Sequence, residues 1–145
     1  MAHPNVLTDD ARIAEVLRST RRVAVLGIKT EVQADQAAYY VPAFLAARGL
    51  DVVPVPVYYP EVTEILGKRV VRDLAAVPGP VDLVDVFRKP SDIPAHLADL
   101  RKLGPRLVWF QLGIRNDAAA EELARAGILV VQDRCLMVEW NRLVG

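Results

Sequence analysis

A chain of 145 residues, 52% of them hydrophobic, is long and apolar enough to build a folded core, which excludes a disordered protein. Its 18 basic and 18 acidic side chains balance, which argues against a nucleic-acid binder, because such proteins usually carry a net basic charge. Cys135 is the single cysteine, no apolar run approaches the roughly 18 residues of a membrane span, and no signal-peptide core is present, so the sequence predicts a soluble cytoplasmic protein.

Predicted helices and strands alternate along the chain. The spacing of Ile13, Val16 and Leu17 predicts a first helix, capped by Thr8 and ending near Ser19. The four apolar residues at 23–26 predict a buried strand that runs into a turn at Gly27. The elements predicted after this turn are, in chain order, a helix at 38–48, a strand at 52–55, a helical turn at 61–66, a strand at 69–71, a short helix at 73–77, a strand at 81–87, a helix at 91–103, a strand at 107–110, a helix at 117–126, a strand at 128–131 and an amphipathic turn at 136–143.

This alternation predicts an α/β fold: a doubly wound, mostly parallel Rossmann-like sheet flanked by helices on both faces. No linker, repeat or low-complexity segment interrupts the pattern, so we expect residues 1–145 to form a single domain. In such sheets ligands bind beyond the carboxyl ends of the strands. The residues that directly follow each predicted strand are therefore the candidates for function.

Cations recur at these candidate positions. Lys29 follows the first strand, Arg88 and Lys89 follow the strand at 81–87, and Arg115 and Arg134 follow the last two strands. Each of them taken singly is more simply a solvated loop charge. Because all of them are predicted at one edge of the sheet, we expect them together to surround an anion that carries several phosphates.

Two common nucleotide sites are disfavoured by the sequence. No second glycine occurs between Gly27 and Gln36, and no acidic residue follows the strand at 52–55, where a dinucleotide site places a carboxylate for the ribose. Asp51 lies at the opposite end of that strand. The Gly-Lys-Ser/Thr sequence of a P-loop does not occur.

No assembled catalytic centre is predicted. His3 and His96 do not follow strands, and both are expected at the surface. Asp82 and Asp85 lie three residues apart in one strand, so they point to opposite faces and cannot act as a pair. Neither serine lies in a G-x-S-x-G elbow, and no His, Cys, Asp or Glu group has metal-ligand spacing. We therefore expect a protein that binds no metal and is not an enzyme on its own.

Cys135 is the remaining reactive candidate, and two interpretations of it stay open. The neighbouring Arg134 would favour a thiolate. Cysteine more often serves as a small buried apolar residue, and that interpretation is slightly preferred.

Several segments, taken in order, resemble the small bacterial and archaeal CoA-binding proteins, which are single Rossmann-like domains similar to the CoA-binding domain of the succinyl-CoA synthetase alpha subunit. The resemblance spans nearly the whole chain. Its most specific parts are VDVFR at 84–88, WFQLG at 109–113 and DRC at 133–135, together with the segments at 23–27 and 49–55.

The resemblance implies coenzyme A as the ligand, with its 3′-phospho-ADP end over the turn at Gly27. In the place of the Arg-Pro-Ser-like run that the family usually has before its second helix, this chain has Gln36-Ala37-Ala38. The positions carried over for the ligand are Gly27, Ile28 and Lys29, with Thr30, at the phosphates; Pro56 and Tyr58 at the adenine; Phe87, Arg88 and Lys89 across the cleft; Gln111, Gly113 and Ile114 nearer the pantetheine arm; and Arg134 at the rim.

The function predicted from the residues and the resemblance is binding of CoA or an acyl-CoA, with no catalytic centre in the chain. One alternative is a redox role in which Cys135 forms a mixed disulfide with the CoA thiol. Another is a non-catalytic subunit of a larger acyl-CoA enzyme. Neither nucleic acid nor a membrane is expected as a partner.

Overall fold

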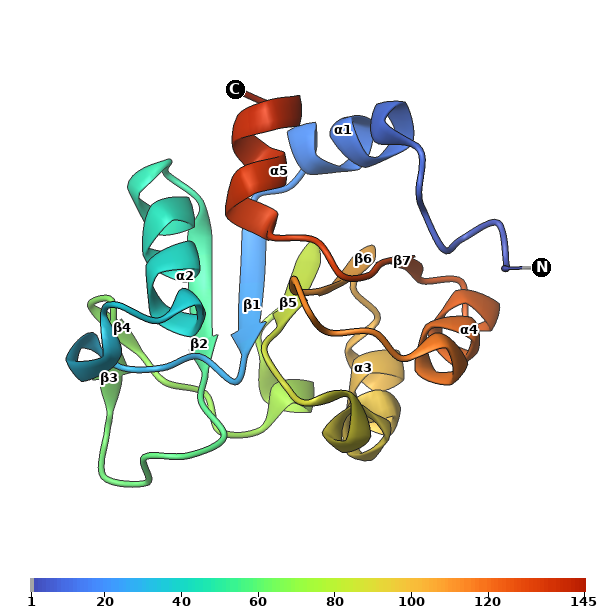
Figure 1. The fold of residues 1–145 in the computed structure, drawn as a ribbon. Coiled ribbons are helices and arrows are strands. Elements are labelled where there is room, and N and C mark those ends of the chain that lie inside the picture. Colours follow the sequence, from blue (N-terminus) through green and yellow to red (C-terminus); the bar gives the residue numbers. More distant parts are fainter. Residues whose placement is uncertain (1) are drawn as a thin grey trace.

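The computed structural model describes residues 2–145. It contains a five-stranded parallel sheet with helices on both faces, which confirms the predicted α/β Rossmann-like fold (Figure 1). The strands follow each other across the sheet in the order β2-β1-β5-β6-β7. Their bounds are β1 (Arg22–Leu26), β2 (Asp51–Val55), β5 (Leu83–Val86), β6 (Leu107–Phe110) and β7 (Leu129–Val131).

The helices form one layer on each face of the sheet. α1 (Asp10–Arg18), α2 (Ala37–Ala47) and α5 (Leu136–Leu143) cover one face (Figure 1). α3 (Leu97–Leu103) and α4 (Asp117–Arg125) cover the other. Three short 3₁₀ helices complete the connections: η1 (Glu31–Gln33), η2 (Leu74–Ala76) and η3 (Pro90–His96).

The alternation of side chains along each strand divides the core between the two faces. Val25 and Trp109 pack under α1, α2 and α5, whereas Leu26 and Phe110 pack under α3 and α4. All four residues of β5 are buried, and Asp85 is one of them. Asp82 lies just before β5, and its carboxylate accepts the backbone N–H groups of Arg21 and Arg22 at the entry to β1.

The region between β2 and η2 differs from the prediction. Instead of a helical turn at 61–66, a short antiparallel hairpin joins β3 (Glu64–Ile65) to β4 (Lys68–Arg69). Its two turn residues, Leu66 and Gly67, have φ values of 55° and 70°. Two consecutive residues with positive φ make the tight hairpin turn that matches strand twist, and Leu66 carries no sequence signal for that conformation.

The single helix predicted at 91–103 is interrupted. The segment begins as η3 and becomes the α-helix α3 only at Leu97. Pro94 lies inside η3 and supplies no backbone N–H, so the α-helical hydrogen-bond pattern is established only after it. This interruption fixes the position of His96 at the junction. A smaller difference concerns α1, whose cap is Asp9 and not Thr8.

Backbone from elsewhere in the chain lies along both outer strands. At β7, Leu7 N donates to Val130 O at 2.7 Å and Val130 N donates to Asn5 O at 2.9 Å, so residues 5–7 lie along the outer edge of this strand. At β2, Val71 N donates to Pro54 O at 2.9 Å.

The strand order reverses between β1 and β5. From β1 the chain moves outward to β2, and β5 then pairs with the other side of β1. Such a reversal leaves a crevice at the carboxyl ends of the two central strands, because the loops that follow them turn in opposite directions. The loops after β1, β2 and β5 meet at this place.

Candidate functional site

The turn at Gly27 holds the loops after β1, β2 and β5 close together. Gly27 N donates to Val55 O at 2.9 Å, and Gly27 has a φ of 85°. A Cβ atom at this position would lie 2.4 Å from Phe87 O, which is a backbone atom and cannot swing aside. The predicted need for glycine here therefore has two causes, the positive φ and the close approach.

The residues after Gly27 take different roles. The Ile28 side chain is only 1% exposed and belongs to the core, so it offers a ligand no more than its backbone. Thr30 caps η1 in a capping box with Gln33. Lys29 N donates to Ala38 O, and the Lys29 ammonium donates to Gln36 Oε1.

The first turn of α2 faces the same edge. Gln36 is its N-cap residue but makes no side-chain capping bond, so the leading N–H groups of the helix have no side-chain partner. Gln36 is one of the residues that stand in place of the Arg-Pro-Ser-like run, and its amide oxygen binds Lys29. Tyr39 N and Tyr40 N donate to Gln36 O, and the N-terminus of the helix lies beside the ammonium of Lys29, an arrangement suited to an anion.

Arg88 is the centre of a side-chain cluster after β5. Its guanidinium carbon lies 5.7 Å from the centroid of the Tyr58 ring, and its Nε donates to His96 Nε2 at 3.2 Å. Asp92 forms an ion pair with it at 3.6 Å. The Arg88 side chain is only 14% exposed, whereas Tyr58 is 63% exposed, so the guanidinium is held beneath an accessible aromatic ring. Lys89 beside it is exposed.

His96 was expected at the surface, and it is only partly exposed there. The residue is half-buried at the junction of η3 and α3. Burial and then the positive charge of Arg88 lower the pKa of its imidazole below the ordinary value. The ring is therefore neutral at pH 7. No strand precedes His96 directly, and only the interrupted helix turns it toward Arg88.

Two adjoining hollows open at the carboxyl end of β2. One has a volume of about 360 Å³ and lies between the ends of β1 and β2 and the start of α3. The other, of about 610 Å³, lies under the aromatic loop that includes Tyr58. Arg72 lines both of them, and it was not among the residues predicted for the site. The predicted adenine-side residue Pro56 also lines the first hollow.

Arg72 fixes the shape of the aromatic loop. Its Nη1 donates to Tyr58 O at 3.0 Å, and its Nη2 donates to Tyr59 O at 2.7 Å and Val62 O at 2.6 Å. Tyr59 has a φ of 62°, a strained value for a residue with a bulky side chain. Three carbonyl contacts to one guanidinium compensate for this strain and hold Tyr58 above Arg88.

The residues predicted near a pantetheine arm lie beyond β6. Gln111 is buried, and its Oε1 accepts from Leu136 N at 3.3 Å, which fixes the start of α5. Gly113 N donates to Asp133 Oδ1 at 2.7 Å, and Asp133 N donates to Ile114 O at 3.1 Å. These bonds lock the loops after β6 and β7 to each other.

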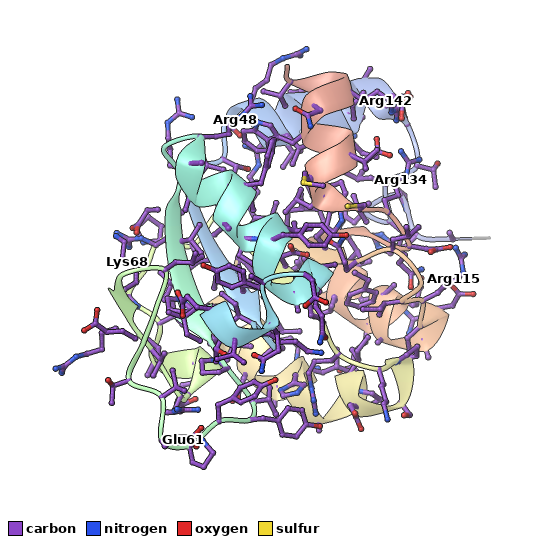
Figure 2. The ribbon with its side chains drawn as sticks, turned by 60° about the vertical axis from the view of Figure 1, so that its left-hand side comes forward. Arg48, Glu61, Lys68, Arg115, Arg134 and Arg142 are labelled. Atoms are coloured by element: carbon purple, nitrogen blue, oxygen red, sulfur yellow. The ribbon has the colours of Figure 1, made fainter. Side chains whose placement is uncertain are left out.

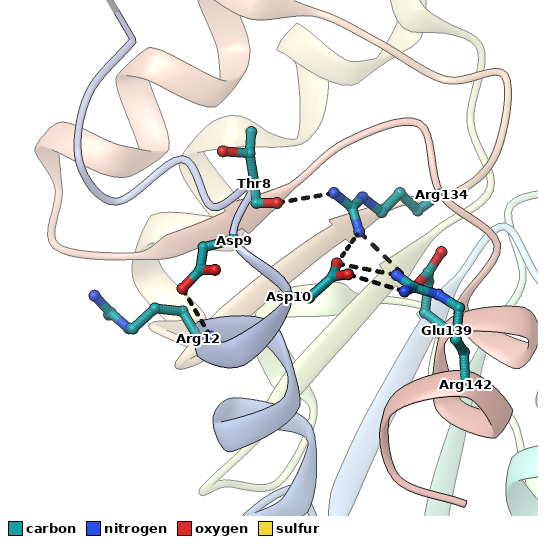
Figure 3. A network of polar contacts seen from close by, with 7 residues as sticks. All are labelled: Thr8, Asp9, Asp10, Arg12, Arg134, Glu139 and Arg142. Atoms are coloured by element: carbon teal, nitrogen blue, oxygen red, sulfur yellow. Dashed lines mark hydrogen bonds and ion pairs between the residues drawn. The ribbon is translucent and has the colours of Figure 1, made fainter.

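Arg134 and Arg115 do not join the cations of the β1, β2 and β5 loops. The Arg134 guanidinium forms an ion pair with Asp10 at 3.0 Å and donates to Thr8 O at 3.0 Å (Figure 3). Arg115 forms an ion pair with Asp117 at 3.1 Å. Both lie on the opposite side of the molecule from Glu61, which marks the aromatic loop (Figure 2). The expectation that five cations surround one anion is therefore wrong.

Cys135 and Asp85, two further candidates for chemistry, have no catalytic partner residues beside them. Cys135 is partly buried against the core and is the N-cap of α5 without a side-chain capping bond. Its proposed disulfide chemistry stays a prediction. Asp85 is fully buried, both of its carboxyl oxygens lack a hydrogen-bond partner, and burial raises its pKa well above the ordinary value.

Within residues 2–145 no group of three acidic, His or Cys side chains could hold a metal, and no helix is long and apolar enough to span a membrane.

The fold and the site define a class: a Rossmann-like domain whose loops form a cation-bearing crevice at the point where strand order reverses. A dinucleotide site places a carboxylate at the carboxyl end of β2. Asp51 is instead the first residue of β2, at the opposite end of the strand, and forms an ion pair with Arg22. The class is therefore a nucleotide-type binding domain without the ribose-binding carboxylate of an NAD site.

Comparison with known proteins places the chain within this class. Residues 21–141 match the family described as CoA binding domain, and the chain belongs to this family. A solved structure from Thermus thermophilus, described as cell-free ID.343, is 40% identical, with a TM-score of 0.85 over 94% of this chain and 99% of that one. A hypothetical protein from Pyrococcus horikoshii OT3 is 31% identical, with a TM-score of 0.84 over 100% of this chain and 98% of that one. YneT of Bacillus subtilis (strain 168) is 30% identical over 88% of this chain and 91% of its own.

Proposed function

We propose that this protein binds coenzyme A or an acyl-CoA at the carboxyl ends of β1, β2 and β5, and that it acts as a binding protein without chemistry of its own. The observation that carries the proposal is the arrangement around Gly27. There the exposed ring of Tyr58, the guanidinium of Arg88 and a hollow of about 360 Å³ adjoin a glycine turn that packs directly against the backbone of Phe87.

The chemistry of CoA matches this arrangement in two ways. Its diphosphate and 3′-phosphate require cations and backbone N–H groups, which Lys29, Arg88 and the open start of α2 supply. Its adenine requires an apolar surface of limited size, which Pro56 and Tyr58 supply. A dinucleotide with two bases would lack its usual carboxylate partner at β2.

The proposed placement follows the loops. The diphosphate lies over Gly27, the Ile28 backbone, Lys29 and Thr30. The adenine lies against Pro56 and Tyr58, with Phe87, Arg88 and Lys89 across the crevice, and the pantetheine arm extends toward Gln111, Gly113 and Ile114. Arg134 has no part in it, because its guanidinium is held by Asp10.

Isothermal titration calorimetry with CoA and with dephospho-CoA tests the proposal. We expect CoA to bind, and dephospho-CoA to bind about tenfold more weakly, since one charge-assisted phosphate contact is removed. A Lys29→Ala variant should weaken both ligands, whereas Lys102→Ala, which removes a surface lysine of α3, should weaken neither. Absence of CoA binding to the unmodified protein would refute the function, and equal binding of the two ligands would refute the 3′-phosphate contact.

A further inference from the structure

The hollow beside α3 is lined by two kinds of surface. Both apolar and polar residues line it. The apolar ones are Leu26, Val55, Pro56, Val57 and Leu74, and the polar ones are Arg72, Asp73, His96 and Asp99. A flat ring with apolar faces and polar edge atoms would suit such a mixed lining.

Two of the four polar residues are already engaged within the protein. The Arg72 guanidinium donates to three carbonyl oxygens of the aromatic loop. The Asp73 carboxylate accepts from Ala75 N at 3.0 Å and caps η2. His96 and Asp99 are the two polar lining residues that these bonds do not involve.

The bond to Arg88 fixes the proton of the neutral His96 ring. Arg88 Nε can only donate, so His96 Nε2 accepts and carries no proton. The one proton of a neutral imidazole must then lie on Nδ1. His96 thus presents an N–H donor that Arg88 does not use.

Asp99 supplies the complementary acceptor. It lies in the first turn of α3, three residues after His96, so the two side chains project from neighbouring positions of one helix face. Its carboxylate has no hydrogen bond or ion pair to any other side chain of residues 2–145. The hollow therefore presents one donor and one acceptor side by side.

We propose that His96 and Asp99 select the base of the nucleotide, namely a purine that carries an amino group next to a ring nitrogen. The ring nitrogen accepts from His96 Nδ1–H, and the amino group donates to the Asp99 carboxylate. A 6-oxo purine would place its carbonyl oxygen against that carboxylate, so it is disfavoured. This inference rests on the proposed function, because it assigns the base end of the same ligand.

The test compares CoA with deamino-CoA, in which the 6-amino group of the base is replaced by a carbonyl oxygen. Calorimetry should give at least about tenfold weaker binding of deamino-CoA to the unmodified protein, because the Asp99 carboxylate then faces a carbonyl oxygen and not a donor. In Asp99→Asn the side chain offers an amide donor, and the preference for CoA should shrink to about twofold or reverse. Glu15→Gln, an exposed change on α1, should leave the preference unaltered.

His96 is tested by two substitutions. His96→Leu removes the donor and should weaken CoA about tenfold, whereas His96→Gln retains an N–H donor and should recover most of the affinity. Equal affinities for CoA and deamino-CoA in the unmodified protein, or a preference that Asp99→Asn leaves intact, would overturn the assignment while the proposed CoA binding stands. Loss of all CoA binding by the unmodified protein would instead refute the proposed function itself.

Discussion

Two arginine-rich regions of this molecule use the same side chain for opposite purposes. Between α1 and α5, Arg134 and Arg142 both bind Asp10, and Glu139 neutralises them further (Figure 3). At the carboxyl ends of β2 and β5, Arg88 contacts an aromatic ring and an imidazole in addition to Asp92. The first region ties two helices together, and the second leaves charge beside an open hollow.

The difference shows that an arginine after a strand is no evidence for a ligand until its partners are known. At α1, hydrogen bonds from Arg142 and then Arg134 hold the pKa of the Asp10 carboxyl well below its usual range. That network is complete within the protein. Around Arg88, the opposing charge is a single carboxylate at 3.6 Å, and the neighbouring hollow remains accessible.

The largest expected effect tests the turn on which the open region depends. Gly27→Ala should lower the free energy of unfolding by about 3 kcal/mol, because the new Cβ meets a backbone carbonyl and the positive φ is strained. Urea denaturation measures the loss. Gly127→Ala is the matched control, since its φ is 87° and its Cβ would meet nothing within 4 Å, and it should cost only about 1 kcal/mol. Equal losses in the two variants would show that the close approach at Phe87 is unimportant.

The second effect concerns Asp85, which lies between the two regions in the middle of the sheet. Its folded-state pKa is raised by burial, so the stability that it contributes is present below the unfolded pKa and is lost as the pH rises through the folded value. The free energy of unfolding should fall by up to about 1.4 kcal/mol per pH unit above roughly pH 4. Asp85→Asn should remove this slope in denaturation series between pH 4 and 7. A slope that persists in the variant would show that Asp85 is not its source.

The third effect separates the two regions by ligand affinity. Arg88→Ala should weaken CoA about tenfold, because a charge-assisted contact and the support of the Tyr58 ring are lost together. Arg88→Lys should not restore the affinity, since an ammonium cannot reproduce the planar contacts. Titration calorimetry measures both variants against Arg101→Ala, a partly exposed arginine on α3. Unchanged CoA affinity in Arg88→Ala would remove this region from the binding site.

The smallest effect is expected at the closed region. Arg134→Ala should leave CoA affinity unchanged and lower the melting temperature at neutral pH. Because the pKa of Asp10 is depressed, the stability of this network is present above the unfolded pKa of about 4 and is lost as the pH falls. The difference in melting temperature should therefore shrink on going from pH 7 to pH 3. A loss of CoA affinity in Arg134→Ala would instead show that Arg134 contacts the ligand.

Sequence patterns predicted the sheet because its strands are short apolar runs separated by helices and glycine turns. The Gly27 turn and the cation at Arg88 were also predicted, because each directly follows an apolar run that the sequence marks as a strand. Arg134 was placed wrongly because its partner Asp10 is 124 residues away in the chain, and no local pattern records such a contact. His96 was missed because its position depends on Pro94 interrupting a helix, and Arg72 because it acts through backbone carbonyls.

The backbone contacts along the outer strands have a consequence for how copies of the protein meet. Exposed strand edges are templates for pairing with other chains, and here residues 5–7 lie along β7 while Val71 binds the outer edge of β2. Removing the first eight residues would uncover β7 and favour edge-to-edge self-association. Light scattering of such a truncated protein would reveal it, and the short N-terminal segment would then count as protection against aggregation.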